Sequence, residues 1–196
     1  ASASHIRELL INGACADEFL TPESAAICAR ERAAGRAPVT MANAERAILA
    51  RLRAMREEDF APFDGGGEGL YHRLYDAVQR ETTIDGILAA AKSKRYAYAR
   101  LRRLLLAGVT PEDIPQRVPY LRVLACNARG REVLRCMKTT AAAPVLTRSA
   151  DVRRLDAGAQ RLFALTARAE EQYVLAYPDL AAARPGSAWT TDPVIL

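Results

Sequence analysis

Hydrophobic residues recur at intervals of three and four along most of the chain, and this spacing predicts a series of amphipathic helices. The first helix starts at Ser2, whose hydroxyl suits an N-cap, and ends at Gly13. The second starts with Thr21 as the cap and Pro22 in the first turn, and ends near Gly35.

The same periodicity continues through the rest of the chain. Further helices are expected from Thr40 through Met55, from Glu68 through Val78, from Thr83 through Ala91, and over residues 92–107, 130–138 and 156–177. A glycine-rich break separates the third and fourth of these helices at residues 60–67, and a turn is expected around Thr110 and Pro111. Residues 144–147 should be extended, while residues 120–124 fit a strand or a helix equally well.

Composition agrees with a mainly α fold, a helical domain with at most two short extended segments. Half of the 196 residues are hydrophobic, alanine, leucine and arginine dominate, and β-branched residues are sparse. No apolar stretch approaches the roughly 20 residues of a membrane helix. The chain opens without a methionine directly into a helix start, so we expect a segment cut from a longer cytoplasmic protein.

The cysteines and histidines do not form a recognisable reactive or metal site. They stand apart in the sequence, with no CxxC pair: Cys15, Cys28, Cys126, Cys136, His5 and His72. We therefore expect reduced, mostly buried thiols and no bound metal. The sequence contains no glycine-rich P-loop, no HExxH and no nucleophile elbow, and it predicts no catalytic residue.

Charge is concentrated in residues 92–103, KSKRYAYARLRR, of a chain whose net charge is +5. On a helical wheel one face is cationic and includes one ring: Lys92, Arg95, Tyr96, Arg100, Arg102 and Arg103. The other face is apolar and should pack into the core: Tyr98, Leu101, Leu104 and Leu105. Lys94 lies on that second face and should reach outward along its aliphatic stem.

The cationic face has the chemistry of a single-stranded RNA contact. Guanidinium groups can fork onto phosphate oxygens, and Tyr96 can stack on an unpaired base. The alternative is a helical packing or protein-interaction module without RNA affinity, in which these arginines pair with Glu57, Glu58 or Asp85. A DNA-binding protein is disfavoured, because no helix-turn-helix pattern is present.

Two further groups of polar residues are candidates for function. Ser2, Ser4 and Arg7 lie at a helix N-terminus, which attracts anions, although an ordinary N-cap explains the serines equally well. Glu68, His72 and Arg73 could form an acid–base pair or a structural pair.

A third group of polar side chains lies in an apolar stretch. Tyr120, Arg122 and Asn127 could line a site or satisfy buried backbone groups.

Four segments, in order along the chain, resemble bacterial tRNA(Met) cytidine acetate ligases, which are HIGH-type nucleotidyltransferases. These are residues 2–7 (SASHIR), 68–73 (EGLYHR), 92–103 (KSKRYAYARLRR) and 120–130 (YLRVLACNARG). The closing residues 191–196 (TDPVIL) also suit the C-terminus of some members. One such segment would be weak evidence for the family, but four segments in the same order are fairly specific to it.

The resemblance implies an enzyme that uses ATP to form acetyl-adenylate and transfers the acetyl group to the wobble cytidine of elongator tRNA(Met), giving N4-acetylcytidine. It implies that residues 1–38 are the helical end of the nucleotidyltransferase domain and that residues 39–196 form a helical C-terminal domain. The HxGH motif of the family's N-terminal catalytic domain is absent here. This chain alone is therefore expected to be inactive and to bind no cofactor tightly, with ATP bound in the full-length parent and the missing domain as a partner in cis.

The resemblance also assigns roles to residues. Ser2, Ser4 and Arg7 would approach the nucleotide phosphates, and Glu68 and Arg73 would be structural. The tRNA-facing surface would comprise Lys92, Lys94, Arg95, Tyr96, Arg100 and Arg103.

Overall fold

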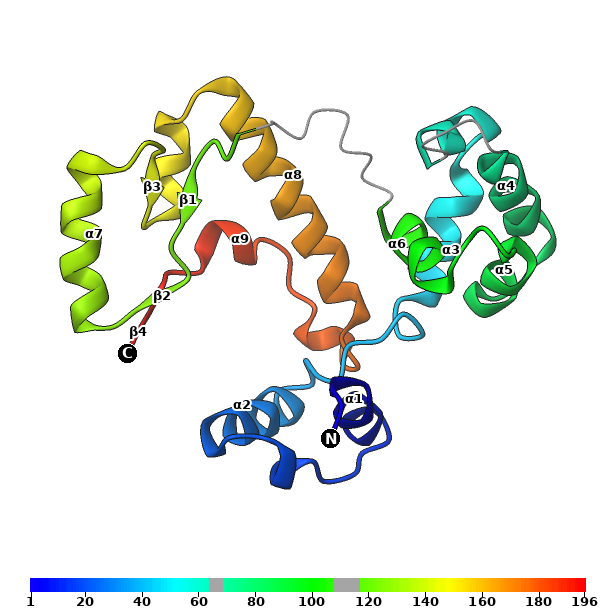
Figure 1. Cartoon of the computed structure of the whole chain (residues 1–196), viewed down its shortest axis with the longest axis horizontal. Coiled ribbons are helices and arrows are strands. Elements are labelled where there is room, and N and C mark those ends of the chain that lie inside the picture. Colours follow the sequence, from blue (N-terminus) through cyan, green and yellow to red (C-terminus); the bar gives the residue numbers. More distant parts are fainter. Residues whose placement is uncertain (64–68, 108–116) are drawn as a thin grey trace. The chain divides into compact units, whose positions relative to one another are not determined.

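A computed structural model describes residues 1–63, 69–107 and 117–196 (Figure 1). The glycine-rich loop at 65–67, Glu68 and the expected turn around Thr110 and Pro111 lie outside the described residues. The described part of the chain is mainly α, as predicted, with strands of only two residues each.

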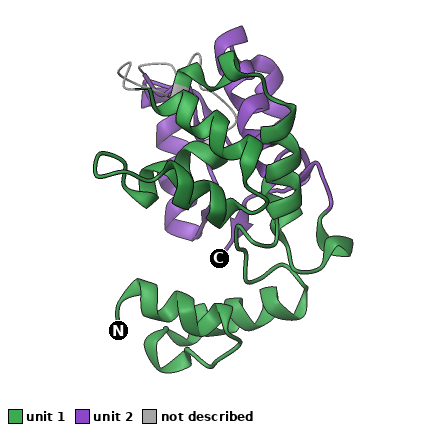
Figure 2. Cartoon of the chain, turned by 90° about the vertical axis from the view of Figure 1, so that its right-hand side faces the viewer, with its two compact units in different colours: residues 1–110, 173–183 green, residues 111–172, 184–196 purple. Residues whose placement is uncertain are grey.

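The chain divides into two compact units (Figure 2). Unit 1 comprises residues 1–110 and 173–183, and unit 2 comprises residues 111–172 and 184–196. Unit 1 is therefore built from two separate stretches of sequence, with most of unit 2 between them.

The first two helices of unit 1 begin and end close to where the sequence predicts. They are α1, Ala3–Ile11, and α2, Pro22–Ala33. The Ser2 hydroxyl accepts the His5 N–H at 3.2 Å, and the Thr21 hydroxyl accepts the Ser24 N–H at 3.3 Å, so both predicted caps are formed. Neither helix contains a buried residue.

The remaining helices of unit 1 share one apolar core. They are α3, Glu45–Ala54; the 3-10 helix η2, Glu57–Phe63; α4, Leu70–Arg80; α5, Ile84–Ala91; and α6, Tyr98–Ala107. Each contributes apolar side chains at helical spacing, and those with no exposed surface are Leu52, Phe60, Leu70, Leu74, Ile87, Leu88, Ala91, Leu101 and Leu105.

Arginines from neighbouring elements satisfy carbonyl groups at the C-terminal ends of several helices in unit 1. The Arg32 guanidinium donates to the Leu10 carbonyl at 2.8 Å, and Arg73 donates to the Ala90 carbonyl at 3.4 Å. Similar bonds join Arg53 to Glu81 and Arg51 to Leu105. The last carbonyls of a helix lack intrahelical partners and carry the negative end of its dipole, so a cation stabilises them.

The second stretch of unit 1 packs back on the first. It contains the 3-10 helices η4, Val174–Ala176, and η5, Leu180–Ala182. The Asn43 amide donates to the Ala176 carbonyl at 3.0 Å, and the Asp179 N–H donates to the Gly35 carbonyl at 3.0 Å. Gly35 has φ +69°, and a Cβ there would lie 2.5 Å from the Asp179 Cβ, so only glycine fits this contact.

Unit 2 combines helices with two pairs of short parallel strands. Strand β1, Leu121–Arg122, pairs with β3, Val145–Leu146, and β2, Ala125–Cys126, pairs with β4, Val194–Ile195. Its helices are α7, Ala128–Thr140; the 3-10 helix η3, Ser149–Arg154; α8, Ala157–Tyr173, whose last residue belongs to unit 1; and α9, Ser187–Thr190. The core comprises Leu146, Val152, Leu155, Ala159 and Phe163.

Three predictions about local structure were wrong. The third helix begins at Glu45 instead of Thr40, because the Thr40 hydroxyl accepts the Asn43 N–H and forms a turn first. The helix expected over residues 92–107 begins only at Tyr98. None of the four cysteines is buried: Cys15 and Cys136 are exposed, and the other two are half-buried.

Within the described ranges, no helix combines the length and the apolar character needed to cross a membrane.

The core of unit 1 gives a test of the packing. Replacing Leu74, which has no exposed surface, by alanine should lower the free energy of unfolding by about 2–5 kcal/mol, because it leaves a cavity in the core. Urea unfolding followed by far-UV circular dichroism measures this loss. The control Leu106→Ala changes a side chain that is 51% exposed and should cost less than about 1 kcal/mol. Equal losses in the two variants would contradict the assigned core.

Candidate functional site

The N-terminus of α1 presents polar groups to solvent. Ser2, Ser4 and Arg7 are all exposed. The Ser2 hydroxyl serves as the N-cap, whereas the N–H groups of Ala3 and Ser4 belong to the first turn and have no intrahelical partner. These N–H groups and the positive end of the helix dipole make the end of α1 suitable for an anion.

A pocket within unit 1 begins one turn further along α1, at Arg7. Its lining also includes side chains from α1, from α2 and the residues after it, and from the second stretch of unit 1, namely Leu10, Ile11, Glu31, Arg36, Tyr173 and Tyr177. Arg36 donates to the Glu31 carboxylate at 2.6 Å and Arg30 donates to it at 3.0 Å, which lowers the pKa of Glu31 to about 2. Arg7 has no ion-pair partner in the described part of the chain, so the pocket keeps an uncompensated cation beside this neutralised carboxylate.

The basic segment, which we define as residues 92–103, starts with a turn and not with a helix. Lys92 caps the C-terminus of α5. The Tyr96 N–H then donates to the Ser93 carbonyl, and the Arg95 N–H donates to the Ser93 hydroxyl, both at 3.2 Å. Helix α6 follows from Tyr98.

This turn exchanges the positions expected for the two tyrosines. Tyr96 is only 4% exposed and belongs to the core of unit 1, whereas Tyr98 is 38% exposed. The Arg100 guanidinium lies 5.4 Å from the centre of the Tyr96 ring, and the Lys92 ammonium lies 4.6 Å from that of Tyr98. The helical wheel placed both rings wrongly, because it assumed helical geometry through residues 92–97.

The cations of the basic segment face solvent without carboxylate partners. Arg100 is half-buried, and the others are exposed: Lys92, Lys94, Arg95, Arg102 and Arg103. Among the described residues, no carboxylate lies within ion-pair distance of any of them, and the expected pairs with Glu57, Glu58 or Asp85 are not formed. Glu57 instead contacts His72.

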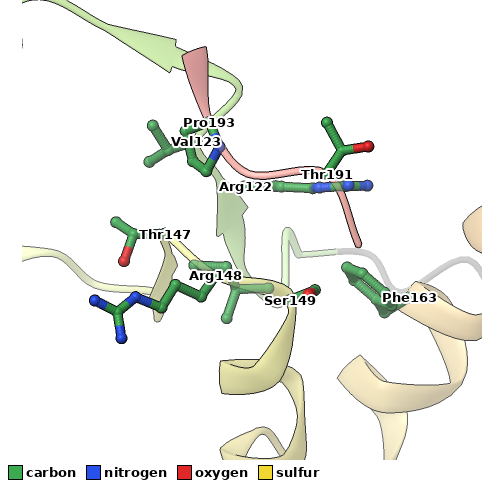
Figure 3. A pocket seen from close by; sticks show the side chains of 9 residues that line it. Arg122, Val123, Thr147, Arg148, Ser149, Phe163, Thr191 and Pro193 are labelled. Carbon is green, nitrogen blue, oxygen red and sulfur yellow. The ribbon is translucent and has the colours of Figure 1, made fainter. Parts of the chain in front are cut away.

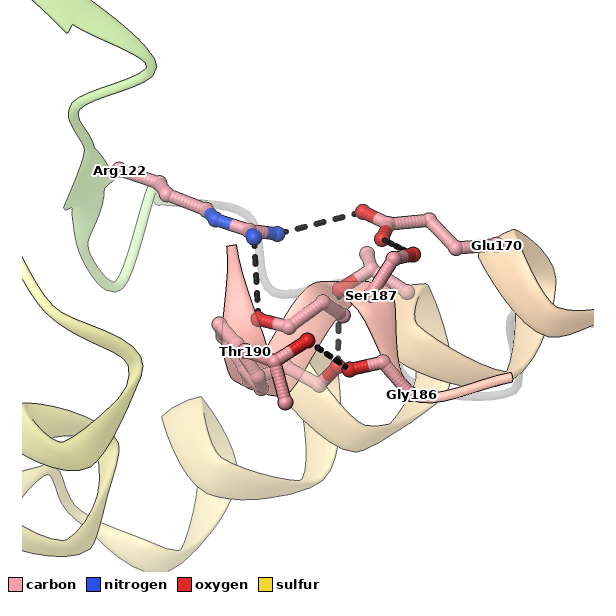
Figure 4. Close-up of polar contacts among 8 residues, drawn as sticks. Arg122, Glu170, Gly186, Ser187 and Thr190 are labelled. Carbon is pink, nitrogen blue, oxygen red and sulfur yellow. Dashed lines mark hydrogen bonds and ion pairs between the residues drawn. The ribbon is translucent and has the colours of Figure 1, made fainter. Parts of the chain in front are cut away.

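The polar residues of the 120–130 segment are occupied in supporting unit 2. Arg122 donates to the Ala188 carbonyl at 3.0 Å and to Glu170 at 3.2 Å (Figure 4). Its guanidinium also lies 5.2 Å from the Phe163 ring centre. Arg122 and Phe163 also line a small pocket (Figure 3). Asn127 caps α7 by accepting the Gly130 N–H at 2.9 Å. Arg122 and Asn127 therefore both bond to backbone groups, and both also line pockets of unit 2.

The expected group at Glu68 is only partly described. Glu68 itself lies outside the described residues. His72 stacks beside Tyr71 and contacts Glu57, and Arg73 bonds to the end of α5. Arg73 therefore holds α4 to α5.

Comparison with known proteins identifies the family to which this chain belongs. The chain matches the HIGH Nucleotidyl Transferase family over residues 1–186, and it belongs to that family.

Its similar relatives are tRNA(Met) cytidine acetate ligases. That of Syntrophomonas wolfei is 28% identical, over 99% of this chain and 50% of the relative. That of Kosmotoga olearia is 34% identical, over 75% of this chain and 37% of the relative.

Solved structures of the Thermotoga maritima protein TmcAL have the same fold. Its apo structure superposes with a TM-score of 0.90 at 25% identity, covering 100% of this chain and 51% of that one. The structure bound with alpha-thio ATP gives 0.88 at 24% identity. The chain thus spans about half the length of the relatives that it matches.

The charge cluster at Glu31 predicts an acid-sensitive contribution to stability. Its arginine partners depress the pKa of Glu31 from 4.5 to about 2, so the contribution is complete above pH 4.5 and is lost as the pH falls to about 2. Glu31→Gln should therefore lower the melting temperature at neutral pH, and the difference from the wild type should shrink over this window. Arg36→Ala should give the same pH dependence. A difference that persists unchanged through the window would contradict the assignment.

Proposed function

We propose that this chain is the tRNA-binding region of an ATP-dependent ligase that modifies tRNA(Met) by acetylating a cytidine. One observation carries the proposal: the basic segment presents five exposed cations that have no ion-pair partner among the described residues. The similarity to tRNA(Met) cytidine acetate ligases over nearly the whole chain supports it.

The chemistry of the segment fits a phosphate backbone. Arg95 and Arg103 carry planar donors that match two phosphate oxygens at once, and Lys92 and Lys94 add point charges. A nucleic acid carries cations condensed along its phosphates, and unpaired cations of a protein displace them. Their release drives binding at low salt.

Tyr98 takes over the stacking role that the sequence gave to Tyr96. Its ring is partly exposed, and the Lys92 ammonium lies over it, so a base could stack beside a cation. Tyr96 and Arg100 would instead position the segment, because the buried ring anchors the turn and supports the guanidinium.

The alternative function, a packing module without RNA affinity, predicts cations engaged within the protein. Several arginines elsewhere in unit 1, such as Arg32 and Arg73, are engaged in this way at the ends of helices. The contrast between those arginines and the cations of the basic segment favours RNA.

We assign residues 1–38 to the end of the nucleotidyltransferase domain, and the rest of the chain to the helical domain. Helices α1 and α2 contain no buried residue and leave Ile11 and Ile27 half exposed, an apolar surface that a covering segment would bury. Ser2, Ser4 and Arg7 would then approach the phosphates of ATP, which supplies the adenylate that activates acetate. The HxGH motif is not in this sequence, so this chain alone should not form the adenylate.

Binding of tRNA at several salt concentrations tests the basic segment. The double variant Arg95→Ala/Arg103→Ala should bind tRNA more weakly, and the slope of log K against log salt should flatten by about 1.5–2, because two phosphate contacts are lost.

A matched control removes the same charge elsewhere. In Arg30→Ala/Arg80→Ala the two arginine side chains are 68% and 77% exposed and lie in α2 and α4, so the slope should stay near that of the wild type. Equal slopes for the two double variants would contradict a role of the basic segment in tRNA binding.

Titration with ATP followed by NMR tests the end of α1. The amide resonances of Ala3, Ser4 and His5 should shift most, and Arg7→Ala should weaken the shifts severalfold, whereas Arg7→Lys should keep part of them. Shifts confined to the basic segment would reject the assignment of the phosphate site.

A further inference from the structure

We propose that α7 carries a second RNA-binding surface, formed by Arg131, Arg135 and Lys138, which contacts phosphates independently of the basic segment. We call these three residues the α7 stripe. The identity of the RNA as tRNA rests on the proposed function, whereas the surface itself is inferred from unit 2 alone.

The three cations form a line along one side of α7. Their spacing of four and three residues places them within about 60° of one another around the helix axis. From Arg131 to Lys138 the helix rises about 10.5 Å, so the stripe is long enough to follow several phosphates. All three side chains are exposed.

Nothing in the described part of the chain neutralises the stripe. Arg131, Arg135 and Lys138 take part in no ion pair or side-chain hydrogen bond there. The only carboxylate on α7 is that of Glu132, and it forms no ion pair with them.

The way α7 packs turns the stripe outward. Gly130, Val133 and Leu134 line an apolar depression that also includes Cys126 of β2 and Leu196. Gly130 and Val133 lie on sides of the helix away from the stripe, and Leu134 lies between the depression and the stripe. No residue of α7 is buried, and the helix lies at the outer edge of unit 2, with β2 along one side (Figure 1).

The distribution of charge between the units also points to unit 2. Its residues include twelve Lys or Arg and eight Asp or Glu, which leaves four of the five net positive charges of the chain. Unit 1 has sixteen Lys or Arg and fifteen Asp or Glu, although it contains the basic segment. Net charge therefore favours unit 2 as a site for a polyanion, in addition to the local cluster of cations in the basic segment of unit 1.

The surroundings of the stripe favour a phosphate backbone over an acidic protein. Protein interfaces generally have an apolar centre with large side chains, whereas the neighbours of the stripe around α7 are Ala128, Glu132 and Thr139 on one flank and the half-buried Leu134 on the other. A row of cations without such a centre suits a ligand that is recognised by charge and spacing.

Salt-dependent tRNA binding by the whole chain tests the stripe. Arg131→Ala/Arg135→Ala/Lys138→Ala should weaken binding about tenfold or more at low salt and flatten the salt slope by about 2–3. The matched control, Arg153→Ala/Arg154→Ala/Arg161→Ala, removes three exposed cations from the same unit and should change the slope much less. Equal effects of the two triple variants would overturn the proposal, because net charge alone would explain them.

A variant that should bind more tightly distinguishes an effect of the stripe from an effect of misfolding. Glu132→Gln removes the one negative charge on α7 and should tighten tRNA binding about twofold, an effect that loss of structure cannot produce. Unchanged or weaker binding by this variant would count against the stripe.

The outcomes also separate the stripe from the basic segment. If Arg95→Ala/Arg103→Ala weakens binding and the α7 triple variant does not, the stripe is rejected and the proposed function stands. If only the triple variant weakens binding, the stripe stands and the role of the basic segment fails.

Discussion

The apolar core shared by α3, α4, α5 and α6 determines how the basic segment is displayed. Tyr96, Leu101 and Leu105 are all buried in that core, although Tyr96 precedes the helix that carries the two leucines. The Tyr96 ring is buried from a turn, and α6 begins two residues later. This arrangement directs Lys94 and Arg95 outward. The cations are therefore displayed by the packing of their apolar neighbours.

Arginine has two physical uses in this chain, and its abundance alone distinguishes neither. One group donates to carbonyls at helix ends, as Arg32, Arg73 and Arg122 do. Arg51 also donates to such a carbonyl, that of Leu105, and because its side chain is partly buried the pKa of its guanidinium is lowered. Another group is exposed and forms no ion pair among the described residues, including Arg95 and Arg103 in the basic segment and Arg131 and Arg135 on α7. The positive charge available to an anionic partner is thus smaller than the number of arginines implies.

Local signals in the sequence predicted most of the helices, because caps and apolar spacing act over a few residues. Ser2, Thr21 and Thr83 all cap helices, and the long helix expected near residues 156–177 is α8 followed by η4. Features that depend on distant residues could not be predicted in this way. The pairing of β2 with β4 joins residues about seventy positions apart, and the burial of Tyr96 depends on helices contributed by residues 45–91. Five of the cations expected in the basic segment are exposed, whereas Arg100 is half-buried and the accessible ring is Tyr98.

The contact between Gly35 and Asp179 joins the two separate stretches of unit 1. Because residues of unit 2 lie between these stretches in the sequence, the polypeptide passes between the two units more than once. The chain crosses between the units at three points, after residues 110, 172 and 183, and several covalent connections restrain relative motion more than a single linker does. They also mean that unit 1 cannot be produced as one uninterrupted fragment. A chain cut near residue 110 would lose the stretch that contributes Ala176 to the core of unit 1 and Asp179 to the contact with Gly35.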